Sequence, residues 1–228
     1  MFNAHNFHPA TNPHPLHVGI IPDGGRRWAV NNGCSLRAAY QHTCQKLENL
    51  VEALWQLQVD ELSIYIASKE NFRRPDNEVN AFIETTKKAF EFHISTLAQR
   101  HNLRVCVAGN KQALPKPLAD AAINLEKQTA ANSNGTLNLC VGYHPADEIL
   151  HALQRASCPE DFYNHLWVKK PIDLIIRSGG ANLLSNFLPL QAGYARLYFF
   201  NELFNDLKNE QIRQTIDLYC NELLKYGT

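Results

Sequence analysis

The sequence predicts an α/β protein with a mainly parallel central sheet of about six strands, covered by helices. Short apolar runs alternate with stretches in which apolar residues recur every three or four positions. Several of these runs end in glycine, arginine or carboxylate residues, and open α/β sheets bind ligands beyond the carboxyl ends of their strands. At 228 residues the chain is long enough for one domain with a substantial core.

Apolar runs of four to six residues predict the strands. These runs cover residues 18–21, 62–67, 103–108, 137–141, 172–176 and 197–200. Amphipathic spacing and proline positions predict the helices, one of which begins at Trp28. The others cover residues 36–57, 78–99, 117–131, 145–156, 159–168 and 209–225. No repeat or linker interrupts the pattern, so residues 17–228 are expected to form one catalytic domain.

Composition excludes several classes of function. Lys and Arg together number 22, as do Asp and Glu, so the net charge is zero and general nucleic-acid binding is not expected. The paired arginines at 26–27 and 73–74 suit a small polyanion better than a long one. No apolar run approaches the roughly 20 residues that a membrane-spanning helix needs.

Residues 1–16 are expected to form a flexible arm, because histidines stand there among Asn and Pro without the apolar segment of a signal peptide. Metal binding by these histidines is an alternative that lacks a Cys partner at ligand spacing. The six cysteines contain no C-x-x-C pair and are expected to be reduced thiols in a cytoplasmic protein.

The stretch from 16 to 28 carries the strongest chemical signal. A buried strand ends in Asp23, Gly24, Gly25, Arg26 and Arg27, directly before a helix. Glycines allow close approach of a ligand, a helix start favours anions, and a carboxylate beside an anion site suggests Mg²⁺ bridging it to phosphate. The alternative is a solvated turn with an aspartate cap. G-x-x-x-x-G-K-[ST] and G-x-G-x-x-G are both absent, which disfavours nucleotide triphosphate hydrolysis and dinucleotide binding.

Two further strand ends carry polar residues. Residues 68–75 include Asn71 and paired arginines that suit bidentate phosphate contacts, although a charged loop is the ordinary interpretation. Arg177 begins Arg-Ser-Gly-Gly, a second candidate anion site. Arg196 stands in an apolar and aromatic stretch, where an unpaired charge is costly. We expect it to pair with Asp23 or to face a ligand anion.

Residues 17–28, 68–75 and 173–199 resemble the three signature regions of the cis-prenyltransferases, the undecaprenyl diphosphate synthase family. The resemblance runs from about residue 17 to the C-terminus. It implies an elongated apolar cleft, a homodimer and Mg²⁺-dependent chemistry on allylic diphosphates. It also implies catalytic roles for Asp23, as the Mg²⁺ ligand, and for Asn71.

The resemblance assigns the remaining site residues to substrate binding. Gly24, Gly25, Arg26, Arg27 and Arg74 would hold the allylic diphosphate, and Arg177 and Ser185 the diphosphate of the second substrate, normally isopentenyl diphosphate. Trp28, Tyr40, Ser68, Phe72 and Arg196 are further candidates for contact with substrate.

The departures from the family pattern concern mostly the second site. Ala181 replaces a glutamate, Leu183 replaces a diphosphate-binding arginine, and Arg196 replaces a second metal-ligating glutamate. Leu36 and Tyr40 replace an arginine and a histidine. The sequence therefore predicts that Arg196 faces Asp23 or the second diphosphate and that the second substrate binds differently.

These departures resemble the irregular lavandulyl and cyclolavandulyl diphosphate synthase branch. The expected reaction is head-to-middle coupling of two dimethylallyl diphosphates to a short branched or cyclic product. Bulky Phe90 and Phe92 favour a short product. Three alternatives remain open: short-chain cis elongation with isopentenyl diphosphate, a terpene synthase acting on a longer substrate such as geranyl diphosphate, and a non-catalytic partner subunit.

Overall fold

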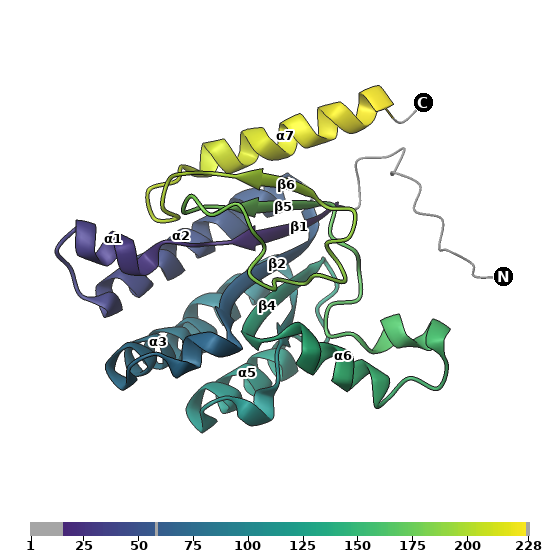
Figure 1. Cartoon of the computed structure of the whole chain (residues 1–228), viewed down its shortest axis with the longest axis horizontal. Helices are drawn as coiled ribbons and strands as arrows, with labels where there is room; N and C mark the ends of the chain where they lie inside the picture. Colours follow the sequence, from purple (N-terminus) through teal and green to yellow (C-terminus); the bar gives the residue numbers. More distant parts are fainter. Residues whose placement is uncertain (1–15, 58, 227–228) are drawn as a thin grey trace.

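A parallel six-stranded sheet organises the chain (Figure 1). The computed structural model describes residues 16–57 and 59–226. The strands are β1 (Leu16–Ile21), β2 (Val59–Ser68), β3 (Arg104–Ala108), β4 (Thr136–Tyr143), β5 (Leu174–Arg177) and β6 (Arg196–Phe199). Their spatial order is β3-β4-β2-β1-β5-β6, and every neighbouring pair is parallel. The predicted fold class is confirmed.

Helices connect successive strands, except that β5 and β6 are joined by an irregular segment. The α-helices are α1 (Gly25–Asn31), α2 (Leu36–Gln56), α3 (Asp76–Lys88), α4 (Ser95–His101), α5 (Lys116–Thr129), α6 (Pro145–Leu153) and α7 (Asn209–Tyr226). The 3₁₀ segments are η1 (Lys69–Arg73), η3 (Lys111–Ala113) and η4 (Pro159–His165), and η2 (Ala89–Ile94) is a π-helical segment between α3 and α4. Among the described residues, no helix is both long and apolar enough to cross a bilayer.

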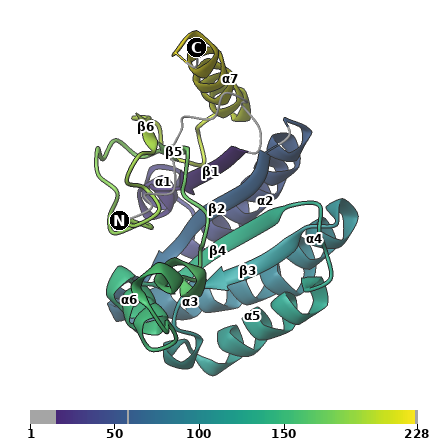
Figure 2. The same ribbon diagram turned by 90° about the vertical axis from the view of Figure 1, so that its right-hand side faces the viewer.

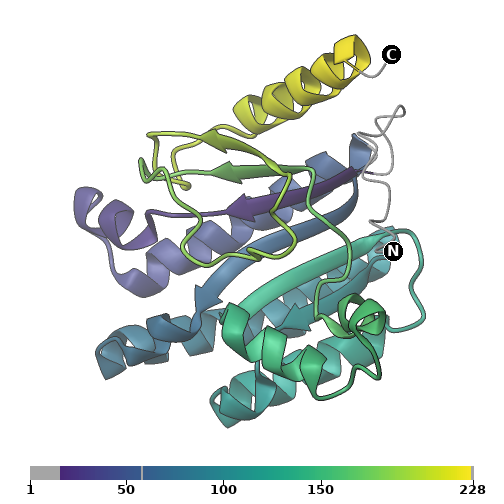
Figure 3. The ribbon, with the colours of Figure 1, turned by 45° about the vertical axis from the view of Figure 1, so that its right-hand side comes forward.

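The sheet has two different faces because successive side chains of a strand point to opposite sides. Leu62, Ile64 and Leu139 belong to the larger core, together with apolar residues of α2, η2, α5 and α7. On the other face, Tyr65 and Cys140 pack with Phe187 and Leu188 of the irregular segment between β5 and β6. Figures 1 and 3 show α7 next to β5 and β6 and α5 near the opposite end of the strand order. Figure 2 shows helices beneath β2, β3 and β4.

Besides boundary shifts of a few residues, three differences from the sequence prediction concern the N-terminal arm and two of the helices. Leu16, expected in the arm, is buried as the first residue of β1, whereas residues 1–15 lie outside the described residues. The helix predicted over 78–99 is divided by η2, which helical periodicity alone does not distinguish. The helix predicted over 159–168 is the 3₁₀ segment η4.

Candidate active site

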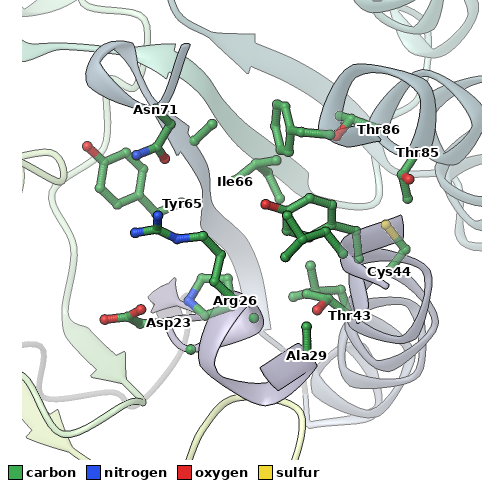
Figure 4. A pocket seen from close by; sticks show the side chains of 18 of the residues that line it. Asp23, Arg26, Ala29, Thr43, Cys44, Tyr65, Ile66, Asn71, Thr85 and Thr86 are labelled. Atoms are coloured by element: carbon green, nitrogen blue, oxygen red, sulfur yellow. The ribbon is translucent and has the colours of Figure 1, made fainter. Parts of the chain in front are cut away.

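The carboxyl ends of β1, β2 and β5 meet at one edge of the sheet and border a cavity of about 1000 Å³. The loop after β1, the segment after β2, and Arg177 at the end of β5 form one end of the cavity. Side chains of α2, α3 and η2 form the other end. In Figure 4, Asp23, Arg26, Tyr65 and Asn71 lie at the first end, and Thr85 and Cys44 lie at the second. The convergence predicted from the sequence is present.

Asp23 is held by two arginines at this edge. Arg177 Nη2 donates to Asp23 Oδ2 at 2.9 Å, and Arg27 Nη2 lies 3.3 Å from Asp23 Oδ1. Arg177 is only 5% exposed, and its Nη1 donates to Ser185 Oγ at 2.7 Å and to the Leu183 carbonyl at 2.6 Å. Its Nε has no hydrogen-bond partner. A buried guanidinium with an unused donor is suited to receive a ligand anion.

The loops after β1 and β5 are joined by short polar contacts. Ser178 Oγ accepts from the Asp23 N–H and donates to the Asp23 carbonyl, each at 3.1 Å. Arg27 Nη1 donates to the Gly179 carbonyl at 2.8 Å. Gly179 has φ +88°, and a Cβ there would lie 2.7 Å from Arg27 Nη2. A Cβ would also lie 3.1 Å from the Asp23 carbonyl oxygen, and the positive φ favours glycine, so Gly179 allows the loops after β1 and β5 to approach closely.

The last residue of β2, Ser68, lines the cavity together with Asn71 and Arg74 of the segment that follows. The Ser68 N–H donates to Asn71 Oδ1 at 3.1 Å, so the side-chain oxygen is engaged in the turn. Figure 4 shows the side chains of Asn71, Tyr65 and Arg26 turned toward one another. Arg26 Nη1 lies 3.6 Å from Glu78 Oε2, which joins the start of α1 to the start of α3 at the cavity.

The other end of the cavity is mainly apolar. Ile64, Ile66 and Leu139 of the sheet face Leu47 of α2 and Phe90 of η2. The polar groups of this region labelled in Figure 4 are the hydroxyls of Thr43, Thr85 and Thr86 and the thiol of Cys44. Burial raises the pKa of Cys44 to about 11, so this thiol is neutral at physiological pH. The cavity therefore combines a cationic end with an apolar end.

Most of the predicted site residues line the cavity. They are Asp23, Gly24, Gly25, Arg26, Arg27, Tyr40, Ser68, Asn71, Arg74, Arg177 and Ser185. Trp28 and Phe72 are not among the lining residues: Trp28 Nε1 donates to Asp206 Oδ1 at 2.8 Å, and the Phe72 ring packs against Phe82. Phe92 is 64% exposed and also lies outside the lining, whereas Phe90 belongs to it.

The expectation that Arg196 faces Asp23 is wrong within this chain. The register pairs Arg196 with Leu174 at the start of β5, whereas Arg177 at the end of β5 pairs with Phe199. Leu174 points into the larger core, so Arg196 shares its side of the sheet, where its charge acts on Tyr219 of α7. Asp23 pairs with Arg177 and Arg27 instead.

Sequence reasoning missed Tyr65 and Glu78, both of which line the cavity. Tyr65 Oη donates to the Ser185 carbonyl at 3.0 Å and so joins β2 to the candidate second anion site. Burial raises the pKa of Tyr65 and keeps it a donor at neutral pH. The alternation of side chains along a strand could have identified Tyr65. It stands between Ile64 and Ile66 and must therefore point to the opposite face of the sheet from them.

Asp23 is the residue that best fits a divalent cation here. Among the described residues, no group of three or more His, Cys, Asp or Glu is arranged to hold a metal. Mg²⁺ is commonly bound by one or two carboxylates together with substrate phosphates. The Asp23 side chain is 35% exposed and lies beside the unused Nε of Arg177. A single carboxylate next to a buried guanidinium with an unused donor fits this mode of binding.

The fold and cavity together define an α/β protein whose site suits a ligand with an anionic head and an apolar tail. Residues 21–227 match the family described as "Putative undecaprenyl diphosphate synthase". An isoprenyl transferase of Leptospira interrogans is 28% identical over 93% of this chain and 95% of its own length. An isoprenyl transferase of Streptococcus agalactiae is 31% identical over 94% of this chain and 93% of its own length.

A solved structure agrees with these sequence matches. The crystal structure of lavandulyl diphosphate synthase from Lavandula x intermedia, in complex with dimethylallyl diphosphate, is similar with a TM-score of 0.84. It is 26% identical and covers 91% of this chain and 96% of that one. The chain belongs to the undecaprenyl diphosphate synthase family and is a prenyltransferase. The family resemblance noted in the sequence is confirmed.

Proposed function

We propose that this prenyltransferase couples two molecules of dimethylallyl diphosphate head to middle, giving a short branched or cyclic ten-carbon diphosphate. The observation that carries the proposal is the changed second anion site. Arg177 and Ser185 remain there, but Leu183 offers only its carbonyl, to Arg177, and an apolar side chain that is 53% exposed. Similarity to a lavandulyl diphosphate synthase crystallised with dimethylallyl diphosphate supports the same reaction.

The residues of the cationic end have complementary roles in this proposal. Arg26, Arg27 and Arg74 bind the diphosphate that departs, and Arg177 binds the second one through its unused Nε. Asn71 orients a phosphate oxygen through its amide. Asp23 would hold Mg²⁺, which neutralises charge on the departing diphosphate. The apolar end excludes water from the cation that forms.

The reaction balances without a further reagent. The allylic C–O bond breaks, and its electron pair leaves with diphosphate. The double bond of the second molecule attacks the resulting cation through its middle carbon, and a proton is then lost to a base. No oxidant or nucleotide is needed.

Product analysis tests the proposal directly. The full chain is incubated with Mg²⁺ and dimethylallyl diphosphate alone, and the products are analysed by mass spectrometry and NMR. We expect a branched or cyclic ten-carbon diphosphate and no product after chelation of Mg²⁺. Absence of that product, together with efficient elongation when isopentenyl diphosphate is added, would show regular cis elongation instead. Hydrocarbon or alcohol from geranyl diphosphate alone would indicate a terpene synthase.

A further inference from the structure

The Tyr40 ring stands at the boundary between the two ends of the cavity. It belongs to α2 and lines the cavity. A Cβ built on Gly25 would lie 3.8 Å from Tyr40 Cε1, so the ring is next to the backbone that precedes Arg26 and Arg27. On its other side it contacts Phe82, which also lines the cavity. Carbon atoms of a ligand whose phosphate contacts the arginines would therefore lie beside this ring.

Aromatic packing orients the Tyr40 ring. Tyr40 and Phe82 meet edge to face, with centroids 6.0 Å apart and planes at 85°. Phe82 meets Phe72 in the same way at 5.7 Å and 82°, which ties the pair to η1. Tyr40 Oη is buried, which raises the pKa of the hydroxyl, and the Arg74 side chain is close enough to act on it in the opposite direction. The orientation of the ring is thus set by α3 and η1.

Ionisation of an allylic diphosphate places a positive charge at this boundary. The faces of aromatic rings carry negative electrostatic potential and attract cations, most strongly where water is excluded. Of the two nearby carboxylates, Asp23 is paired with Arg177, whereas Glu78 Oε2 lies 3.6 Å from Arg26 Nη1 and makes no hydrogen bond. A free carboxylate would also capture the cation as an ester, whereas a ring face stabilises it without forming a bond.

We propose that the face of the Tyr40 ring stabilises the allylic cation and that Phe82 positions the ring. As the C–O bond breaks and diphosphate leaves with the electron pair, positive charge spreads over the two ends of the allyl group beside the ring. The inference rests on the proposed function only in requiring an allylic diphosphate as substrate. It assigns Tyr40 a catalytic role separate from diphosphate binding.

A substitution series at Tyr40 tests the ring. Tyr40→Phe keeps the ring, Tyr40→Leu removes it, and phenylalanines with one, two and three fluorines at position 40 weaken its negative face while nearly preserving its shape. The readout is diphosphate release from dimethylallyl diphosphate, analysed as kcat and KM. We expect Tyr40→Leu to lower kcat about tenfold to thirtyfold, with KM changing less than about threefold. Relative to Tyr40→Phe, log kcat should fall stepwise with each fluorine.

The control is the same fluorinated series at Phe162 in η4, which does not line the cavity and should leave kcat unchanged. A flat series at position 40, or a loss in Tyr40→Leu confined to KM, would overturn the proposal. The fluorinated series decides the question even if Tyr40→Leu fails to fold. If the wild-type product is an elongated chain, head-to-middle coupling fails, but the trend in diphosphate release still decides the role of the ring. No diphosphate release from any allylic diphosphate overturns both.

Discussion

Asp23 shows how a single residue depends on its neighbours across the sheet. In the family pattern a second carboxylate accompanies this aspartate, and here two guanidiniums contact it, at 2.9 Å and 3.3 Å. These contacts stabilise the carboxylate when no phosphate is bound. We expect a diphosphate entering the site to compete for the same arginines, which would free Asp23 oxygens for a cation. Binding of substrate and metal should therefore be mutually dependent.

His17 gives a prediction about pH and stability. It is fully buried in β1; Nε2 lies 2.8 Å from Ser63 Oγ, and Nδ1 lies 2.9 Å from the Pro171 carbonyl. Burial lowers the pKa of His17 from 6.5 to about 4. The folded chain thus binds a proton less readily than the unfolded chain, so stability is full above pH 6.5 and is lost as the pH falls toward 4.

The expected loss at pH 5 relative to pH 7.5 is about 2 kcal/mol in the free energy of unfolding. Urea denaturation at the two pH values measures it, and His17→Gln should lack this part of the difference. Burial also raises the pKa of nearby Asp173 and Glu61, and this makes the free energy of unfolding rise as the pH falls. Comparison with the His17 variant separates the contribution of His17 from these opposite contributions. Equal pH dependence in both proteins would contradict this account.

At the scale of elements, Gly24 sets the position of α1. Its φ is +116°, and a Cβ there would lie 2.8 Å from Leu203 Cδ2 and 3.2 Å from Leu203 Cα. Gly24→Ala should displace the start of α1, and with it Arg26 and Arg27. We expect KM for the allylic diphosphate to rise at least about tenfold, with a cost of roughly 1–3 kcal/mol in stability from the backbone strain.

Gly135→Ala is the matched control for this effect. It also has positive φ, +131°, and its Cβ would lie 2.5 Å from Trp55 Cζ2, but Gly135 is outside the cavity lining. It should destabilise the fold comparably and leave KM unchanged. Steady-state kinetics and thermal unfolding of the two variants separate the effects. A similar rise in KM in both would mean that Gly24 acts through stability alone.

Elements also show where sequence reasoning succeeds and fails. The sequence predicts that the strand ends carrying Asp23 and Arg177 converge, because open α/β sheets bind ligands beyond the carboxyl ends of their strands. Asp23 does contact Arg177, and β1 and β5 are neighbours in the sheet. The position of Arg196 depends on the register between β5 and β6, which no motif encodes. Apolar residues in the π-helical segment η2 recur at nearly the spacing of an α-helix, so the sequence pattern does not distinguish the two. Local sequence patterns thus predict helices and strands. The register between strands and a change of helical type depend on contacts made by the whole fold.

At the scale of the molecule, the β6 edge of the sheet is exposed and apolar on both sides. Leu197 and Phe199 of β6 are 44% and 36% exposed, and Leu218 of α7 is 57% exposed. An edge strand also offers backbone hydrogen-bonding groups to another chain. We propose that a second copy covers this edge, giving the homodimer that the family resemblance implies. Phe199 pairs with Arg177, so the interface would lie next to the active site.

Light scattering coupled to size-exclusion chromatography tests this arrangement. The wild-type chain should have about twice the monomer mass of 25.9 kDa. Leu197→Glu combined with Leu218→Glu places two charges in a surface that a stable dimer must desolvate, so this variant should be monomeric. Leu150→Glu is the control, because Leu150 is similarly exposed at 55% but lies in α6, away from α7 and β6 (Figure 1). If the wild-type chain is monomeric at concentrations where it is active, or if Leu150→Glu dissociates it equally, the β6 edge is not the interface.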